Sequence, residues 1–114
     1  MNHHSENETW LIDCGDCIIE KKAAHGEAAL TDRERLIYCL WITDYMLRNA
    51  GDFENAIDLY PDFKVDAERL AQKLSLQVTK ETFGLSIEQL QQQYFERFES
   101  ICNEIKAVEY GSIA

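Results

Sequence analysis

The sequence TDRERLIYCLWITDYMLRN, residues 31–49, is the stretch of this chain that decides its fold. It opens with Thr31 and Glu34, which stand at the spacing of a capping box, a pattern that starts helices. Behind this cap, apolar side chains occupy nearly every face of the expected helix. A helix that is apolar on all sides packs against several neighbours, so residues 32–49 are predicted to form the central helix of a bundle.

The segment before the central helix is also predicted to be helical. Its apolar side chains recur at helical spacing, and residues 25 and 26, a His-Gly pair, are a typical helix end. We therefore expect a first helix over about residues 8–25, preceded by a flexible tail over residues 1–8. The expected inner face of this helix consists of Trp10, Cys14, Cys17, Ile18 and the stem of Lys21, with Leu11 and Ile19 flanking it.

The segment near the end of the chain has the clearest periodicity. Ser86 and Gln89 stand at the spacing of a second capping box. The apolar positions that follow are spaced three or four residues apart, which places them on one face of a long amphipathic helix. These positions are Ile87, Leu90, Tyr94, Phe98, Ile101, Ile105 and Val108. Residues 110–114 are expected to be a tail.

Shorter elements are predicted between the two long patterns. A helical turn is expected at residues 53–59, stopped by Pro61, and a further helix is expected from Phe63 to Leu74. Residues 76–85 are expected to be a connector, with Thr79 and Thr82 as candidate caps and Gly84 as a breaker. The chain is thus predicted to be all-α, a compact bundle of about four to five helices in a single domain over residues 9–109.

The charge of the chain is strongly acidic. There are 21 acidic residues against 11 basic ones, which gives a formal net charge of -10. Such a charge disfavours direct binding to nucleic acid or to an anionic membrane and favours a basic protein partner. Acidity that serves only solubility is the alternative interpretation. The carboxylates predicted to form the partner-binding surface are Glu6, Glu8, Asp13, Asp16, Glu20, Asp44, Asp52, Glu54, Asp58 and Asp62.

Catalytic apparatus is not evident in the sequence. No nucleophile-and-base arrangement or glycine-rich phosphate loop stands out, so we expect a binding protein without a cofactor or a metal ion rather than an enzyme. Asp44 and Arg48 stand four residues apart and are expected to pair. An exposed pair of this kind contributes well under about 1 kcal/mol to stability.

Cys14 and Cys17 form a C-x-x-C motif, which raises a further possibility, a thiol or metal protein. A zinc site needs two more ligands at similar spacing, and the sequence does not supply them. A redox dithiol is favoured by positive surroundings, whereas Asp13 and Asp16 disfavour the thiolate. Two thiols on one helix face are the favoured interpretation. The remaining thiols, Cys39 and Cys102, are expected to be small core residues.

The expected location of the protein is the cytoplasm. No run of residues approaches the length of about 18 apolar residues that a membrane span needs. The N-terminal residues MNHHSENETW are polar and acidic, unlike a secretory signal. The four cysteines are then expected to be reduced thiols.

Residues 34–58, ERLIYCLWITDYMLRNAGDFENAID, resemble the core of a family of bacterial helical proteins of mostly unknown function that includes a dimeric DNA-mimic protein. The buried aromatic helix of that family typically ends in Asn-Gly-Gly-Phe, whereas the chain reads Asn-Ala-Gly-Asp-Phe at residues 49–53. Residues 85–106, LSIEQLQQQYFERFESICNEIK, are similar to the closing helix of the family. The resemblance, over residues 31–60 and 86–109, implies an all-α body and DNA mimicry, and it implies no catalytic residues.

Two functions fit this charge pattern equally well. One is an inhibitor that covers the basic surface of a nucleic-acid-binding protein, for example as a DNA mimic. The other is an immunity protein that neutralises a basic toxin of the nuclease type. Both use carboxylates against a basic surface, so composition does not separate them.

Overall fold

The computed structural model describes residues 6–49 and 60–108, and these are all-α, with no strand among them. The elements are α1 (Glu6–His25), the short 3-10 helix η1 (Glu27–Ala29), α2 (Asp32–Asn49), α4 (Phe63–Lys73), α5 (Gln77–Phe83) and α6 (Ile87–Lys106). The predicted all-α bundle is confirmed. The helical turn expected at residues 53–59 and the tail expected at residues 110–114 lie outside the described residues.

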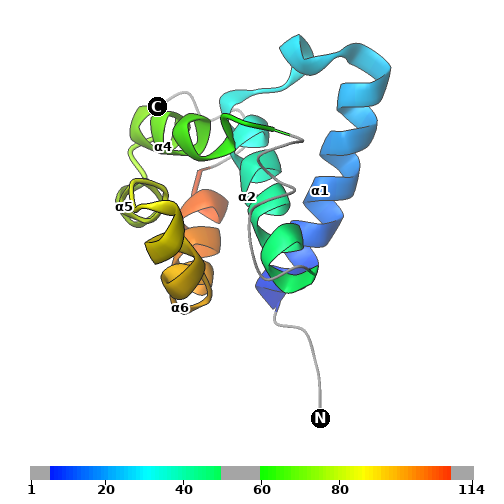
Figure 1. Cartoon of the computed structure of the whole chain (residues 1–114). Coiled ribbons are helices and arrows are strands. Elements are labelled where there is room, and N and C mark those ends of the chain that lie inside the picture. The colour runs from blue at the N-terminus through cyan, green and yellow to red at the C-terminus, as the bar shows by residue number, and fades with distance from the viewer. Residues whose placement is uncertain (1–5, 50–59, 109–114) are drawn as a thin grey trace.

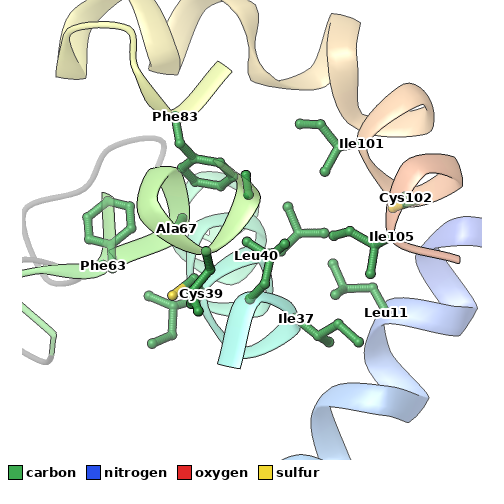
Figure 2. Packing of buried hydrophobic residues seen from close by; sticks show 14 of the residues in the cluster. Leu11, Ile37, Cys39, Leu40, Phe63, Ala67, Phe83, Ile101, Cys102 and Ile105 are labelled. Carbon is green, nitrogen blue, oxygen red and sulfur yellow. The ribbon is translucent and has the colours of Figure 1, made fainter. Parts of the chain in front are cut away.

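Helix α2 is the centre of the bundle, as predicted. It packs against α1, α4 and α6, and Figure 1 shows it between α1 on one side and the group of α4, α5 and α6 on the other. Its Ile37, Cys39 and Leu40 are almost fully buried. Figure 2 shows these side chains surrounded by apolar residues of every other α-helix in the described residues. One continuous core therefore holds the bundle together.

Both predicted capping boxes are present. The backbone N–H of Glu34 donates to Thr31 Oγ1 over 3.1 Å, and the backbone N–H of Thr31 donates to Glu34 Oε1 over 2.9 Å. Ser86 and Gln89 make the same reciprocal pair at the start of α6. Each box satisfies backbone donors that a helix N-terminus leaves without partners.

The apolar stripe of α6 is buried along most of its length, as the periodicity predicts. Leu90, Tyr94, Phe98, Ile101 and Ile105 belong to the core. The two positions at the ends of the stripe, residues 87 and 108, are only half-buried and pack against the core from its edge. The stripe thus seals one side of the bundle.

Helix α1 begins earlier than the sequence predicts. The predicted tail over residues 1–8 is wrong for residues 6–8, which are helical. Asn7 is buried, and its Nδ2 donates to Glu99 Oε1 over 2.6 Å and to Asn103 Oδ1 over 3.3 Å. These acceptors on α6 satisfy the amide nitrogen of Asn7, so the polar start of this segment is anchored in a helix instead of forming a tail.

The inner face of α1 is rotated from the predicted one. Leu11, Gly15 and Ile18 are buried, whereas Cys17 is exposed, so its assignment to the inner face is wrong. Gly15 explains the rotation, because a Cβ built at this position would lie 2.3 Å from Trp41 Cδ1. The indole occupies the space that any other side chain would need. The glycine therefore allows α1 to approach α2 closely.

The prediction of a connector at residues 76–85 is wrong, because α5 occupies most of this segment. Its N-terminus has no local side-chain cap, and a residue of α6 supplies one instead. Glu104 accepts the backbone N–H groups of Val78 and Thr79 and the Thr79 hydroxyl, each over 2.8 Å. Gly84 follows the last helical residue, as expected of a breaker.

The two threonines expected as caps lie inside α5. Thr79 and Thr82 are both buried. The Thr82 hydroxyl donates to the carbonyl of Val78 one turn earlier, over 2.7 Å. The cap for this helix comes from a distant helix, so the local sequence gives no signal of it.

None of the helices in residues 6–49 and 60–108 is long and apolar enough to cross a bilayer.

Replacement of Gly15 by alanine tests the close approach of α1 and α2. In a solvent-exposed helix, Gly→Ala stabilises, but here the added methyl group meets Trp41 and we expect a loss of about 1–3 kcal/mol. The free energy of unfolding is measured by urea denaturation. In a Trp41→Ala background the same Gly15→Ala change should become neutral or stabilising. A higher stability of Gly15→Ala in the wild-type background would refute the close packing.

Replacement of Glu104 by alanine tests the cap of α5. It leaves two backbone N–H groups and the Thr79 hydroxyl without this acceptor, and we expect a loss of about 1–2 kcal/mol in the free energy of unfolding. The exposed Glu96 on the same helix is the matched control, and Glu96→Ala should change stability by less than about 0.5 kcal/mol. Equal effects of the two variants would contradict the capping role.

Candidate protein-binding surface

The outer face of α1 carries a row of carboxylates, Glu6, Asp13, Asp16 and Glu20, which we call the acidic stripe. All four residues are exposed. They are separated by seven, three and four residues, so at the helical period they share one face. That face is opposite the buried Leu11 and Ile18. Four of the five carboxylates predicted in this segment are therefore brought together.

The cations of α1 point away from the acidic stripe. Lys21 Nζ lies 2.8 Å from Glu34 Oε1 of α2. Lys22 Nζ lies over the ring of Tyr38, also of α2, at 4.6 Å from its centroid. Both lysines are thus directed toward the central helix, and the acidic stripe faces solvent without a basic side chain of its own helix beside it.

The spacing of the acidic stripe lets its charges act together. Helical rise places Glu6 and Glu20 about 21 Å apart along the axis, with neighbouring carboxylates about 5–10 Å apart. These separations are comparable to the Debye length of about 8 Å at physiological ionic strength. The negative potentials of neighbours therefore overlap, and the face attracts cationic groups more strongly than one carboxylate would.

Asp44 is not part of any acidic surface, and its prediction as a surface residue is wrong. Only 9% of it is exposed. Its Oδ2 accepts the Tyr94 hydroxyl over 2.8 Å, and its Oδ1 accepts Arg48 Nε over 2.6 Å. The expected pair with Arg48 is confirmed within α2, with the carboxylate buried and the Arg48 side chain 37% exposed. The Tyr94 hydroxyl, not this ion pair, connects Asp44 to α6.

Glu8 belongs to the same group of side chains. Its Oε1 lies 2.9 Å from Arg48 Nη1, and its side chain is mostly buried. The Arg48 guanidinium lies over the rings of Phe95 and Phe98, at 4.8 and 5.4 Å from their centroids. Glu8 therefore holds α1 to the other helices. The network of Glu8, Asp44, Arg48 and Tyr94 joins α1, α2 and α6.

The electrostatics of this network follow from burial and pairing. Burial raises the pKa of Tyr94 well above its ordinary value, and the Asp44 carboxylate adds to this effect, so the phenol remains a donor. Burial acts to lower the pKa of Arg48, but the hydrogen bond and the charges of Asp44 and Glu8 outweigh it and raise that pKa. The guanidinium stays charged between its two carboxylates.

The remaining predicted carboxylates lie elsewhere. Asp52, Glu54 and Asp58 are outside the described residues. Asp62 is exposed and precedes α4, so it belongs to a different element from the acidic stripe.

Cys14 and Cys17 border a small cavity. Its volume is about 170 Å³, and its wall includes Ile18 and Ile37. Burial raises the pKa of the half-buried Cys14 thiol, which disfavours the reactive thiolate. Among the described residues, no group of three or more His, Cys, Asp or Glu side chains could hold a metal ion. The cavity thus offers two thiols but not the four ligands of a structural zinc site.

The other two cysteines are core residues, as expected. Cys39 and Cys102 are buried. Burial raises the pKa of each thiol to about 12. Both therefore stay protonated and act as small apolar groups at neutral pH.

Comparisons with protein-family models, with curated proteins and with solved structures find no match for this chain. The acidic stripe, the buried network and the thiol-bordered cavity are therefore interpreted from their own geometry.

Replacement of Asp44 by alanine tests the network. It leaves the buried Tyr94 hydroxyl without its acceptor and Arg48 with Glu8 alone, and we expect a loss of about 1–3 kcal/mol in the free energy of unfolding. Tyr94→Phe removes one hydrogen bond and should cost only about 1 kcal/mol. Urea denaturation of the single and double variants gives the coupling, and strictly additive losses would show that Asp44 and Tyr94 do not interact.

Proposed function

We propose that this chain is an acidic binding protein whose α1 docks on the basic surface of a protein partner. The acidic stripe is the observation that carries the proposal. Its carboxylates share one solvent-exposed face, while the lysines of the same helix contact α2. A face of this kind pairs with lysine and arginine side chains and accelerates encounter with a basic partner.

The attachment of α1 to the bundle supports the proposal. Asn7 anchors its start to α6, Glu8 pairs with Arg48, and Gly15 packs against Trp41. The carboxylates of the acidic stripe are thus presented at fixed spacing on a helix that is already in place. A preorganised surface loses less conformational entropy on binding than a flexible acidic segment would.

The charge density favours a basic protein surface in general over a close copy of duplex DNA. The acidic stripe has one carboxylate per about 5–7 Å of helix axis, whereas duplex DNA has one phosphate per about 1.7 Å. DNA mimicry and neutralisation of a toxin are both special cases of this docking. Each stays a prediction, and the family resemblance behind the first stays a prediction too.

Neutralisation of the acidic stripe tests the proposal. In pull-downs from cell lysate at low salt, wild-type protein should recover predominantly basic proteins, which moderate salt then releases. The variant Asp13→Asn, Asp16→Asn, Glu20→Gln should recover them at least about tenfold less well, because charge complementarity at the centre of the surface is lost. Quantitative mass spectrometry of the eluted proteins provides the measurement.

A matched variant controls for net charge. Glu81→Gln, Glu88→Gln, Glu96→Gln changes three exposed carboxylates on α5 and α6 and alters the net charge by the same amount. It should recover the basic proteins almost as well as wild type. Equal losses with both variants, or recovery of only neutral and acidic proteins by the wild type, would overturn the proposal. Among the basic proteins that the wild type recovers, added duplex DNA should release those that bind nucleic acid and leave the other basic proteins bound.

A further inference from the structure

An apolar ledge, Ile12, Trp41 and Tyr45, runs beside the acidic stripe. Ile12 is 48% exposed and Tyr45 is 49% exposed, and Trp41 between them is half-buried. The rings of Trp41 and Tyr45 are stacked, with centroids 5.3 Å apart and planes 11° apart. The ledge is thus an apolar surface contributed by two helices.

The register of α1 and α2 places the members of the apolar ledge side by side. Gly15 lies against Trp41, and Lys22 lies over Tyr38, so the two helices run antiparallel with this alignment. Tyr45 is one turn beyond Trp41 on α2, and Ile12 is nearly one turn before Gly15 on α1. Ile12 and Tyr45 therefore lie at the same level on the open side of the helix pair.

The apolar ledge and the acidic stripe share an edge. Ile12 and Asp16 are four residues apart on α1, which brings their Cβ atoms to within about 5–6 Å. The exposed surface therefore has an acidic strip on α1 and, beside it, an apolar strip formed by Ile12 of α1 and two aromatic residues of α2. A solvated acidic face has no need of this apolar strip, whereas a partner with the complementary pattern would bury it.

We propose that the occupant of this surface is an amphipathic basic helix of the partner, with apolar residues on the apolar ledge and arginines on the acidic stripe. Asp13, Asp16 and Glu20 rise along α1 by about 4.5 and 6 Å. Basic residues at positions i, i+3 and i+7 of a partner helix have the same rise, so each can meet one carboxylate.

Arginine fits this surface better than lysine. Its guanidinium pairs with a carboxylate through two hydrogen bonds and also stacks on aromatic rings. The protein already holds one arginine in this way, since Arg48 pairs with Asp44 and Glu8 and lies over Phe95. This inference rests on the proposed function, and it adds the apolar contact and the helical register of the partner.

A synthetic peptide of about four helical turns is the probe. One version has arginine at i, i+3 and i+7 and leucine on the adjacent stripe, and the control version has the same composition in scrambled order. Fluorescence anisotropy of labelled peptide gives the Kd for the full-length protein. The ordered peptide should bind at least about tenfold more tightly than the scrambled one, because only it places leucine on the apolar ledge.

Two protein variants test the apolar ledge. Ile12→Ser and Tyr45→Ser should each weaken the ordered peptide by about three- to tenfold and leave the scrambled peptide unchanged. Val65, which is 63% exposed on α4, is the matched apolar control, and Val65→Ser should change neither affinity. If Tyr45→Ser lowers the Tm below the assay temperature, the affinity of Ile12→Ser for the ordered peptide alone decides whether the apolar ledge takes part in binding.

The outcomes separate this inference from the proposed function. Equal affinities for the two peptides, or no effect of the serine variants, would overturn the docked helix. In that case, weaker binding of both peptides to the triple variant Asp13→Asn, Asp16→Asn, Glu20→Gln would still support a basic partner. If the charge variant binds both peptides as wild type does, the proposed function fails as well.

Discussion

The buried carboxylate of Asp44 is the constraint on which the arrangement of the helices depends. It receives the Tyr94 hydroxyl from α6 and the Arg48 guanidinium from its own helix, and Arg48 in turn reaches Glu8 of α1. A charge in this position is stable only while its partners are in place. The apolar core can tolerate small shifts between helices, whereas these hydrogen bonds need one geometry. The network therefore selects a single packing of α1, α2 and α6.

The same network determines which carboxylates remain for a partner. Glu8 and Asp44 are used inside the bundle, and Glu104 is used to cap α5. The acidic stripe stays exposed to solvent because α1 packs on the bundle through its opposite face, where Gly15 leaves room for the Trp41 indole. Acidic residues of this chain thus divide into those that build the fold and those that face solvent. Net charge alone does not reveal this division.

The sequence predicts the features that depend on nearby residues. The capping boxes, the central helix and the stripe of α6 each follow from spacing along one segment, and each is confirmed. The errors concern contacts between segments. Neither the partner of Asn7 on α6 nor the cap that Glu104 provides for α5 leaves a local pattern. Gly15 lowers helix propensity in isolation, and only the position of Trp41 shows that it is required.

The net charge of -10 connects stability with the proposed binding. Carboxylates that face solvent on one helix repel one another, so the isolated protein loses some stability to its own surface. A basic partner would remove this repulsion when it binds, and the relief would add to the attraction between opposite charges. Salt stabilises the free protein, because it screens the repulsion between its carboxylates. Salt weakens the complex, because it also screens the attraction between opposite charges. The apolar ledge beside the acidic stripe would limit the loss of affinity at higher salt, because the contact made by Ile12 and Tyr45 depends little on ionic strength.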